Sequence, residues 1–133
     1  MEVFFSNLSL PSNALIGTVE FAVRYNSTNF ETSSGSGDWK DDFFVLDQYL
    51  SDWGGNTSTE WIWWYSDDAS KIVDEPNEAN SLRVTLYYKP TGAPSTACID
   101  FINASIKWSL YLSLIHISEP TRPLYISYAV FCL

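Results

Sequence analysis

The sequence predicts an all-β fold, an antiparallel β-sandwich of the jelly-roll type. The first observation behind this prediction is hydrophobic alternation with a period of two residues, which recurs along the chain and is typical of strands that bury one face. The second is that clusters of turn-forming residues separate the alternating runs, as at Pro11–Asn13, Gly54–Asn56 and Asp74–Glu78. Short strands joined by such turns are typical of sandwiches and barrels.

We expect strands at Val3–Leu10, Val19–Tyr25, Glu60–Tyr65, Leu82–Tyr88 and Ile102–Leu110. The third of these reads EWIWWY and is apolar on both faces, so we expect it to be central or covered on both sides. In the last, the apolar positions change parity between Phe101 and Ile102, which predicts a β-bulge or bend there.

The apolar residues within 42–53 fit both the period of a helix and that of a strand. Phe43, Leu46, Leu50 and Trp53 recur at helical spacing after an acidic start and before Gly54, so one short helix is expected there. Alternation at period two fits the same residues nearly as well, which leaves a strand open as the alternative.

Residues 112–133 resemble the conceptual translation of a sequencing adapter. In one reading frame the adapter encodes Leu112–Arg122, a sample index fills the next three codons, and a flow-cell primer encodes Ile126–Leu133. A segment derived from a sequencing library carries no information on the native fold. We therefore expect a single β-sandwich domain at residues 1–111, with truncation at either end left open, followed by a non-native tail at residues 112–133.

The tail contains the only histidine, His116, and one of the two cysteines, Cys132. Residues 1–111 then have no histidine, which excludes histidine-based nucleophile and acid–base chemistry as well as a zinc site built from histidine and cysteine. No pair of acids is placed as a carboxylate glycosidase requires. We therefore expect no enzymatic activity, and we expect Cys98 to be a small buried residue.

Sixteen acidic and seven basic residues give the chain a net charge of −9. Because affinity for phosphate comes largely from lysine and arginine, we expect no direct binding to nucleic acid or to an anionic membrane. No apolar run approaches the roughly 20 residues of a membrane helix, and Met1 is not followed by a basic and apolar leader.

All six tryptophans lie within residues 1–111. Carbohydrate-binding modules stack sugars on exposed aromatic rings, because a flat π-face matches the C–H face of a sugar. Trp61 and Trp63 share one strand face and Trp64 lies on the other, so one face is expected in the core and the other exposed or covered by a partner. Trp39 and Trp53 flank loops rich in glycine and aspartate. Trp39, Trp53, Trp61 and Trp63 are therefore the candidate ligand- or partner-binding residues, and packing inside the sandwich is the alternative.

Asp38, Asp41 and Asp42 cluster beside Gly37. Ca²⁺ prefers several oxygen ligands from carboxylates and loop carbonyls, which such a loop supplies. Asp38 and Asp41 are the candidate metal ligands, and solvated loop charge is the alternative.

Two segments resemble the jelly-roll coat proteins of small icosahedral positive-strand RNA viruses. Gly17–Asn26, which reads GTVEFAVRYN, resembles a strand motif of that family, and the pair Ser81–Lys89 and Ile99–Tyr111 resembles the last two strands of its shell domain. The resemblance covers about a third of residues 1–111, which are shorter than a full shell domain. It implies a capsid protein that self-assembles into a virion, with Ca²⁺ held at subunit contacts by loop aspartates such as Asp38 and Asp41.

The sequence therefore supports two alternative functions. One is a structural, non-enzymatic coat module, and the other is a carbohydrate-binding β-sandwich in which exposed aromatic rings stack on a glycan in an extracellular setting.

Overall fold

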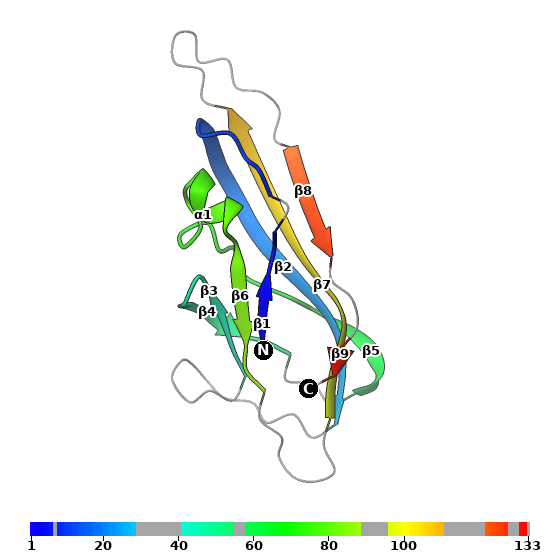
Figure 1. Cartoon of the computed structure of the whole chain (residues 1–133). Coiled ribbons are helices and arrows are strands. Elements are labelled where there is room, and N and C mark those ends of the chain that lie inside the picture. The colour runs from blue at the N-terminus through cyan, green and yellow to red at the C-terminus, as the bar shows by residue number, and fades with distance from the viewer. Residues whose placement is uncertain are drawn as a thin grey trace.

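The computed structural model describes residues 1–6, 8–28, 41–54, 58–88, 96–110, 122–127 and 131–132. These residues form antiparallel strands in two layers and one short helix (Figure 1). The elements are β1 Glu2–Phe4, β2 Ala14–Thr28, β3 Asp42–Val45, β4 Gln48–Asp52, β5 Ser58–Tyr65, α1 Pro76–Asn80, β6 Arg83–Leu86, β7 Thr96–Leu110, β8 Arg122–Ser127 and β9 Phe131–Cys132. The predicted all-β antiparallel sandwich is confirmed.

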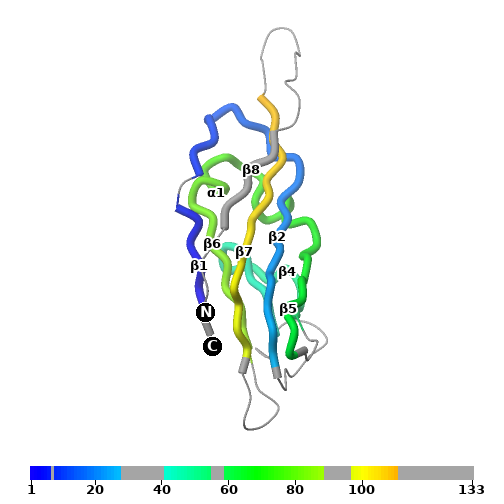
Figure 2. The backbone as a smooth tube through the Cα atoms, turned by 90° about the vertical axis from the view of Figure 1, so that its right-hand side faces the viewer, coloured from blue at the N-terminus to red at the C-terminus, as the bar shows by residue number. Residues whose placement is uncertain are grey.

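The strands divide into two sheets. One has the order β1-β6-β3-β4, and the other has the order β5-β2-β7-β8, with β9 paired to another part of β7. From β1 to β7 the chain crosses to the opposite sheet at every step except the β3–β4 hairpin. Figure 2 shows β2 and β7 side by side along the length of the molecule, where they form the longest strand pair.

The core lies between the two sheets and is built from the inward faces that alternation predicts. Phe43 of β3 packs between the sheets, with its ring centroid 5.3 Å from that of Phe21 and 5.0 Å from that of Trp64. From β2 and β7 the buried apolar residues are Ala14, Val19, Phe21, Val23, Tyr25, Ala97, Ile99, Ile102, Ala104 and Ile106.

Two β-bulges adjust the register between β2 and β7. The pairing passes from Arg24–Phe101 directly to Tyr25–Ile99, so Asp100 is the extra residue. This confirms the predicted bulge, one residue before Phe101. The second bulge is at Gly17 of β2. Ile16 pairs with Trp108 and Thr18 pairs with Lys107, so Gly17 is the extra residue.

The helix expected within residues 42–53 is wrong, because this segment is the β3–β4 hairpin. Leu46 and Asp47 form its two-residue turn with φ angles of 47° and 65°, the pair of left-handed conformations that tight hairpins require. Pairing of β3 with β6 decides the conformation, since it buries Phe43 and Val45 completely. The helix of the structure is instead α1, which begins at Pro76 within the segment expected to be a turn.

Strand lengths and neighbours also differ from expectation. The strand expected at Val3–Leu10 is limited to β1, although Leu8 and Leu10 beyond it are buried. The strand at Glu60–Tyr65 is confirmed as β5, but the prediction that it is central or covered is wrong. It lies at one end of its sheet order and pairs with β2 alone among the described strands.

Residues from the adapter-like tail extend the same sheet. The backbone of β8 pairs with β7 from Asn103 to Trp108, and β9 pairs with Cys98 and Ile99. Cys98 was expected to be a small buried residue; it is half-buried and disulfide-bonded, and β9 brings Cys132 opposite it.

Candidate cation site and exposed aromatic surface

Three carboxylates meet at the open end of the β3–β4 hairpin. Asp42 begins β3 and pairs directly with Asp52, the last residue of β4. Asp41 precedes them, and its carbonyl accepts a hydrogen bond from the Trp53 backbone N–H at 2.8 Å. As a result, the carboxylate oxygens of Asp41, Asp42 and Asp52 lie within 4.8 Å of one another, and we name these three residues the acidic cluster.

The acidic cluster is largely removed from solvent. Asp41 is 2% exposed and Asp42 is 0% exposed, while Asp52 is half-buried. Carboxylates so close together repel one another, and burial strengthens this repulsion because water no longer screens it.

The acidic cluster contributes to a raised pKa at the neighbouring Tyr49. Its hydroxyl donates a hydrogen bond to Oδ1 of Asp52 at 2.9 Å. Burial, this hydrogen bond and the negative charges of Asp52, Asp42 and Asp41 together raise the pKa of Tyr49 to about 12. The phenol therefore stays protonated and remains a donor at neutral pH.

The donor set fits a hard divalent cation such as Ca²⁺. Ca²⁺ binds oxygen at about 2.3–2.6 Å, so two ligands on opposite sides of one ion are separated by up to about 5 Å. The 4.8 Å spread of the acidic cluster lies within that limit. Asp41, Asp42 and Asp52 would hold the cation, which would neutralise their mutual repulsion.

Only part of the acidic cluster was predicted from the sequence. Asp41, one of the two predicted ligands, belongs to it, and Asp38 lies outside the described residues. Asp52 was missed because it is distant along the chain from Asp41. Asp52 could have been predicted from the hairpin, since a turn at Leu46–Asp47 brings residue 52 opposite residue 42.

The candidate binding tryptophans separate into different environments. Trp53 is 1% exposed, donates its indole N–H to the carbonyl of Tyr87 at 2.8 Å, and packs edge-on against Tyr25. Its assignment to surface recognition is therefore wrong, because the residue is part of the core. Trp39 lies outside the described residues.

Trp61 and Trp63 are exposed together with Tyr65, and we name these three residues the aromatic row. Their exposed fractions are 37%, 45% and 68%. The rings of Trp63 and Tyr65 lie nearly parallel, 12° apart, with centroids separated by 6.0 Å. Arg24 of β2 lies 5.7 Å over the ring of Trp61 and pairs with Asp100 at 3.0 Å. Trp64, on the other face of β5, packs against the core.

A shallow hollow of about 280 Å³ adjoins the aromatic row at Tyr65. Its wall is polar on the β7 side, where Oδ1 of Asn103 is buried and accepts no hydrogen bond from the described residues. Its lining consists of Glu20, Phe21, Ala22, Tyr65, Ser66, Asn103, Ser105 and Lys107. The hollow therefore presents both charges and several hydrogen-bonding groups next to an exposed ring.

Comparisons with protein-family models, with curated proteins and with solved structures found no match to this chain. Within the described ranges, no helix is long and apolar enough to cross a membrane.

Proposed function

We propose that residues 1–111 form the assembly module of a viral coat protein, a jelly-roll sandwich that lacks enzymatic activity and builds a virion from many copies. The observation that carries this proposal is the path of the chain, which crosses between two antiparallel sheets at nearly every step from β1 to β7. Jelly rolls are double-sheet folds of this kind, and viral capsid domains use them.

The segments that resemble coat proteins coincide with the main strands of the sandwich. Gly17–Asn26 lies within β2, and Ser81–Lys89 and Ile99–Tyr111 contain β6 and most of β7. These strands contribute buried residues to both layers of the core. The coincidence supports the proposal because the resemblance falls on the residues that specify the fold.

The acidic cluster supplies a means of controlling assembly. A chain with a net charge of −9 resists association with copies of itself through electrostatic repulsion. A Ca²⁺ ion held by Asp41, Asp42 and Asp52 adds two positive charges to each copy and lowers that repulsion. Assembly is then expected to depend on the cation.

The test is the assembly state of the full chain in Ca²⁺ and in EDTA, measured by light scattering and by electron microscopy of stained samples. We expect multimers or particles with Ca²⁺ and smaller species in EDTA. Asp41→Asn is expected to weaken the Ca²⁺ dependence, whereas the matched control Asp67→Asn, an exposed acid outside the acidic cluster, leaves it unchanged. A chain that stays monomeric at every Ca²⁺ and protein concentration would overturn the proposal.

A second candidate function is carbohydrate binding, in an extracellular setting, and one observation favours it. The parallel rings of Trp63 and Tyr65 lie beside a polar hollow, which is the combination of stacking surface and hydrogen-bonding groups that sugars require. The test is tryptophan fluorescence during titration with a panel of glycans. This function is favoured over assembly if a glycan changes the fluorescence of a chain that stays monomeric and if Trp63→Ala abolishes that change. A flat response to the whole panel rejects it.

A further inference from the structure

Strand β5 lies at the edge of its sheet. Among the described strands, β5 pairs only with β2, from Ala22–Tyr65 to Ser27–Ser58, and its other side has no strand neighbour (Figures 1 and 2). An edge strand exposes a row of backbone N–H and C=O groups, which are a template for pairing with another strand.

The register identifies which backbone groups point outward. The N–H of Ser66 donates to the carbonyl of Phe21 at 2.9 Å, and the same register pairs Trp64 with Val23. In an antiparallel ladder, alternate residues exchange hydrogen bonds with the neighbouring strand. From Ile62 onward the even-numbered residues of β5 therefore bond to β2, so Trp63 and Tyr65 turn their N–H and C=O groups to the open side. Trp61 precedes this regular segment, at the register shift, and its side chain is exposed on the same face as those of Trp63 and Tyr65.

The usual protection against pairing is confined to the first part of β5. Natural edge strands carry charged residues, proline or bulges that discourage a second strand. In β5 the charged Glu60 lies before Trp61, where the pairing with β2 shifts register. From Trp61 to Tyr65 the strand has no charge and no proline, and its outer face is the exposed aromatic row. In a chain with a net charge of −9, an uncharged apolar segment is where two copies can approach with the least repulsion.

We infer that β5 pairs with β5 of a second copy of this chain, antiparallel and about a two-fold axis at Trp63. In this register the outward backbone groups of Trp63 meet those of the same residue in the second copy. Trp61 of each copy then lies opposite Tyr65 of the other, on the same face of a continuous sheet. The two aromatic rows merge, so that each ring gains an aromatic neighbour. The inference deepens the proposed assembly function and rests on it.

Disulfide crosslinking tests this register directly. Residues that exchange hydrogen bonds across an antiparallel pair have Cα atoms about 5.5 Å apart, which suits a disulfide. Because no described cysteine is free, an introduced thiol has no competing partner among them. Under mild oxidation in EDTA we expect Trp63→Cys to run mostly as a covalent dimer on non-reducing gels.

Trp61→Cys is the matched control. In the proposed register its two copies lie four residues apart along the strands, about 13 Å, and cannot bond. The double variant Trp61→Cys/Tyr65→Cys places each thiol opposite a thiol of the second copy, so it is expected to crosslink again. Crosslinking of Trp61→Cys as strong as that of Trp63→Cys would overturn the register.

Sedimentation of the unmodified chain in EDTA provides a second measurement that needs no introduced cysteine. We expect a concentration-dependent species of twice the chain mass of 15.1 kDa. Trp63→Glu is expected to shift it to the monomer, with the circular dichroism spectrum unchanged because Trp63 is exposed. If Ca²⁺-dependent particles form but Trp63→Cys never crosslinks, the β5 pairing is rejected and the assembly proposal stands. If the chain is monomeric throughout, both are rejected.

Discussion

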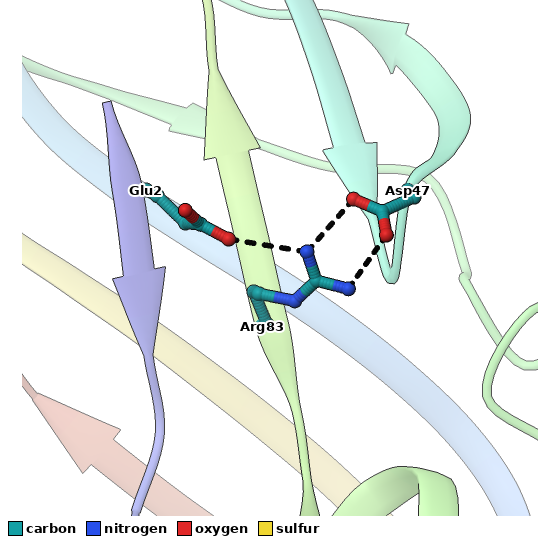
Figure 3. Close-up of polar contacts among 3 residues, drawn as sticks. All are labelled: Glu2, Asp47 and Arg83. Carbon is teal, nitrogen blue, oxygen red and sulfur yellow. Dashed lines mark hydrogen bonds and ion pairs between the residues drawn. The ribbon is translucent and has the colours of Figure 1, made fainter.

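Arg83 of β6 holds Asp47 through two parallel hydrogen bonds (Figure 3). Its Nη1 donates to Oδ1 at 2.8 Å and its Nη2 donates to Oδ2 at 2.7 Å. Nη1 also donates to Oε1 of Glu2 on β1 at 3.1 Å. One guanidinium thus joins β6 and β1 to the β3–β4 turn, where Leu46 and Asp47 adopt positive φ angles, which residues other than glycine rarely do.

Replacing Arg83 is expected to destabilise the sheet in a pH-dependent way. The hydrogen bonds from Arg83 hold the pKa of Asp47 below its ordinary value of 3.8. A lowered folded-state pKa contributes stability that is present above the ordinary value and is lost as pH falls through the folded value. Arg83→Met should therefore lower the melting temperature by a few degrees at pH 7, since exposed ion pairs are weak, and by less near pH 2.

The matched control is Asp47→Asn, which removes the charge and keeps a side chain that tolerates positive φ. It is expected to reproduce the pH profile of Arg83→Met in thermal unfolding followed by circular dichroism. A deficit of equal size at pH 7 and pH 2 in both variants would show that the ion pair does not stabilise the turn.

Tyr49 is expected to make stability fall at alkaline pH. Its folded pKa of about 12 lies above the ordinary value of 10.0, so its contribution is complete below pH 10 and is lost as pH rises toward 12. Partial exposure reduces the effect to the order of 1 kcal/mol. Denaturant unfolding between pH 9 and 12 should show a shallower decline for Tyr49→Phe than for the unmodified chain. Added Ca²⁺ should lower the pKa of Tyr49, because a bound cation offsets the carboxylate charges that raise it.

The strands predicted best are those whose pattern is set by local burial. In β2 and β7 each side chain faces either the core or the outer surface, so alternation locates both strands and the bulge at Asp100. The neighbours of a strand are a non-local property. EWIWWY has the composition of a covered strand, yet β5 lies at an edge, because the sheet order depends on pairings that no single segment encodes.

The hairpin at residues 42–53 shows a second limit. Phe43, Leu46, Leu50 and Trp53 satisfy a helical period, and nothing within the segment excludes it. The outcome depends on β6, which pairs with β3 and draws Phe43 into the core. The same dependence explains why Asp41 was predicted in the acidic cluster while Asp52 was missed.

A side chain at Gly17 is expected to destabilise the fold. A Cβ atom there would lie 3.1 Å from the carbonyl oxygen of Lys107, a backbone atom of β7 that cannot move without disturbing the ladder. Gly17→Ala gains up to about 1 kcal/mol by restricting the unfolded chain, but overpacking of this kind costs about 1–3 kcal/mol. We therefore expect a net loss near 1 kcal/mol in denaturant unfolding, and almost none for Glu20→Ala, which is exposed on the same strand. A stabilised Gly17→Ala variant would mean that the bulge relaxes freely.

The same substitution should affect stability strongly at Trp53 and only slightly at Trp63. Trp53→Phe leaves the carbonyl of Tyr87 without its indole donor and opens space beside Tyr25, so the free energy of unfolding should fall by about 2–3 kcal/mol. Trp63→Phe, at a ring that is 45% exposed, should change it by less than about 0.5 kcal/mol in a monomeric sample.

Fluorescence separates the two sites independently of stability. Acrylamide quenching of the folded chain should weaken in Trp63→Phe, because an accessible fluorophore is lost. In Trp53→Phe the quenched fraction should rise, because the indole removed is 1% exposed and shielded from the quencher. Equal quenching in both variants would contradict the burial of Trp53 and return it to the candidates for surface recognition.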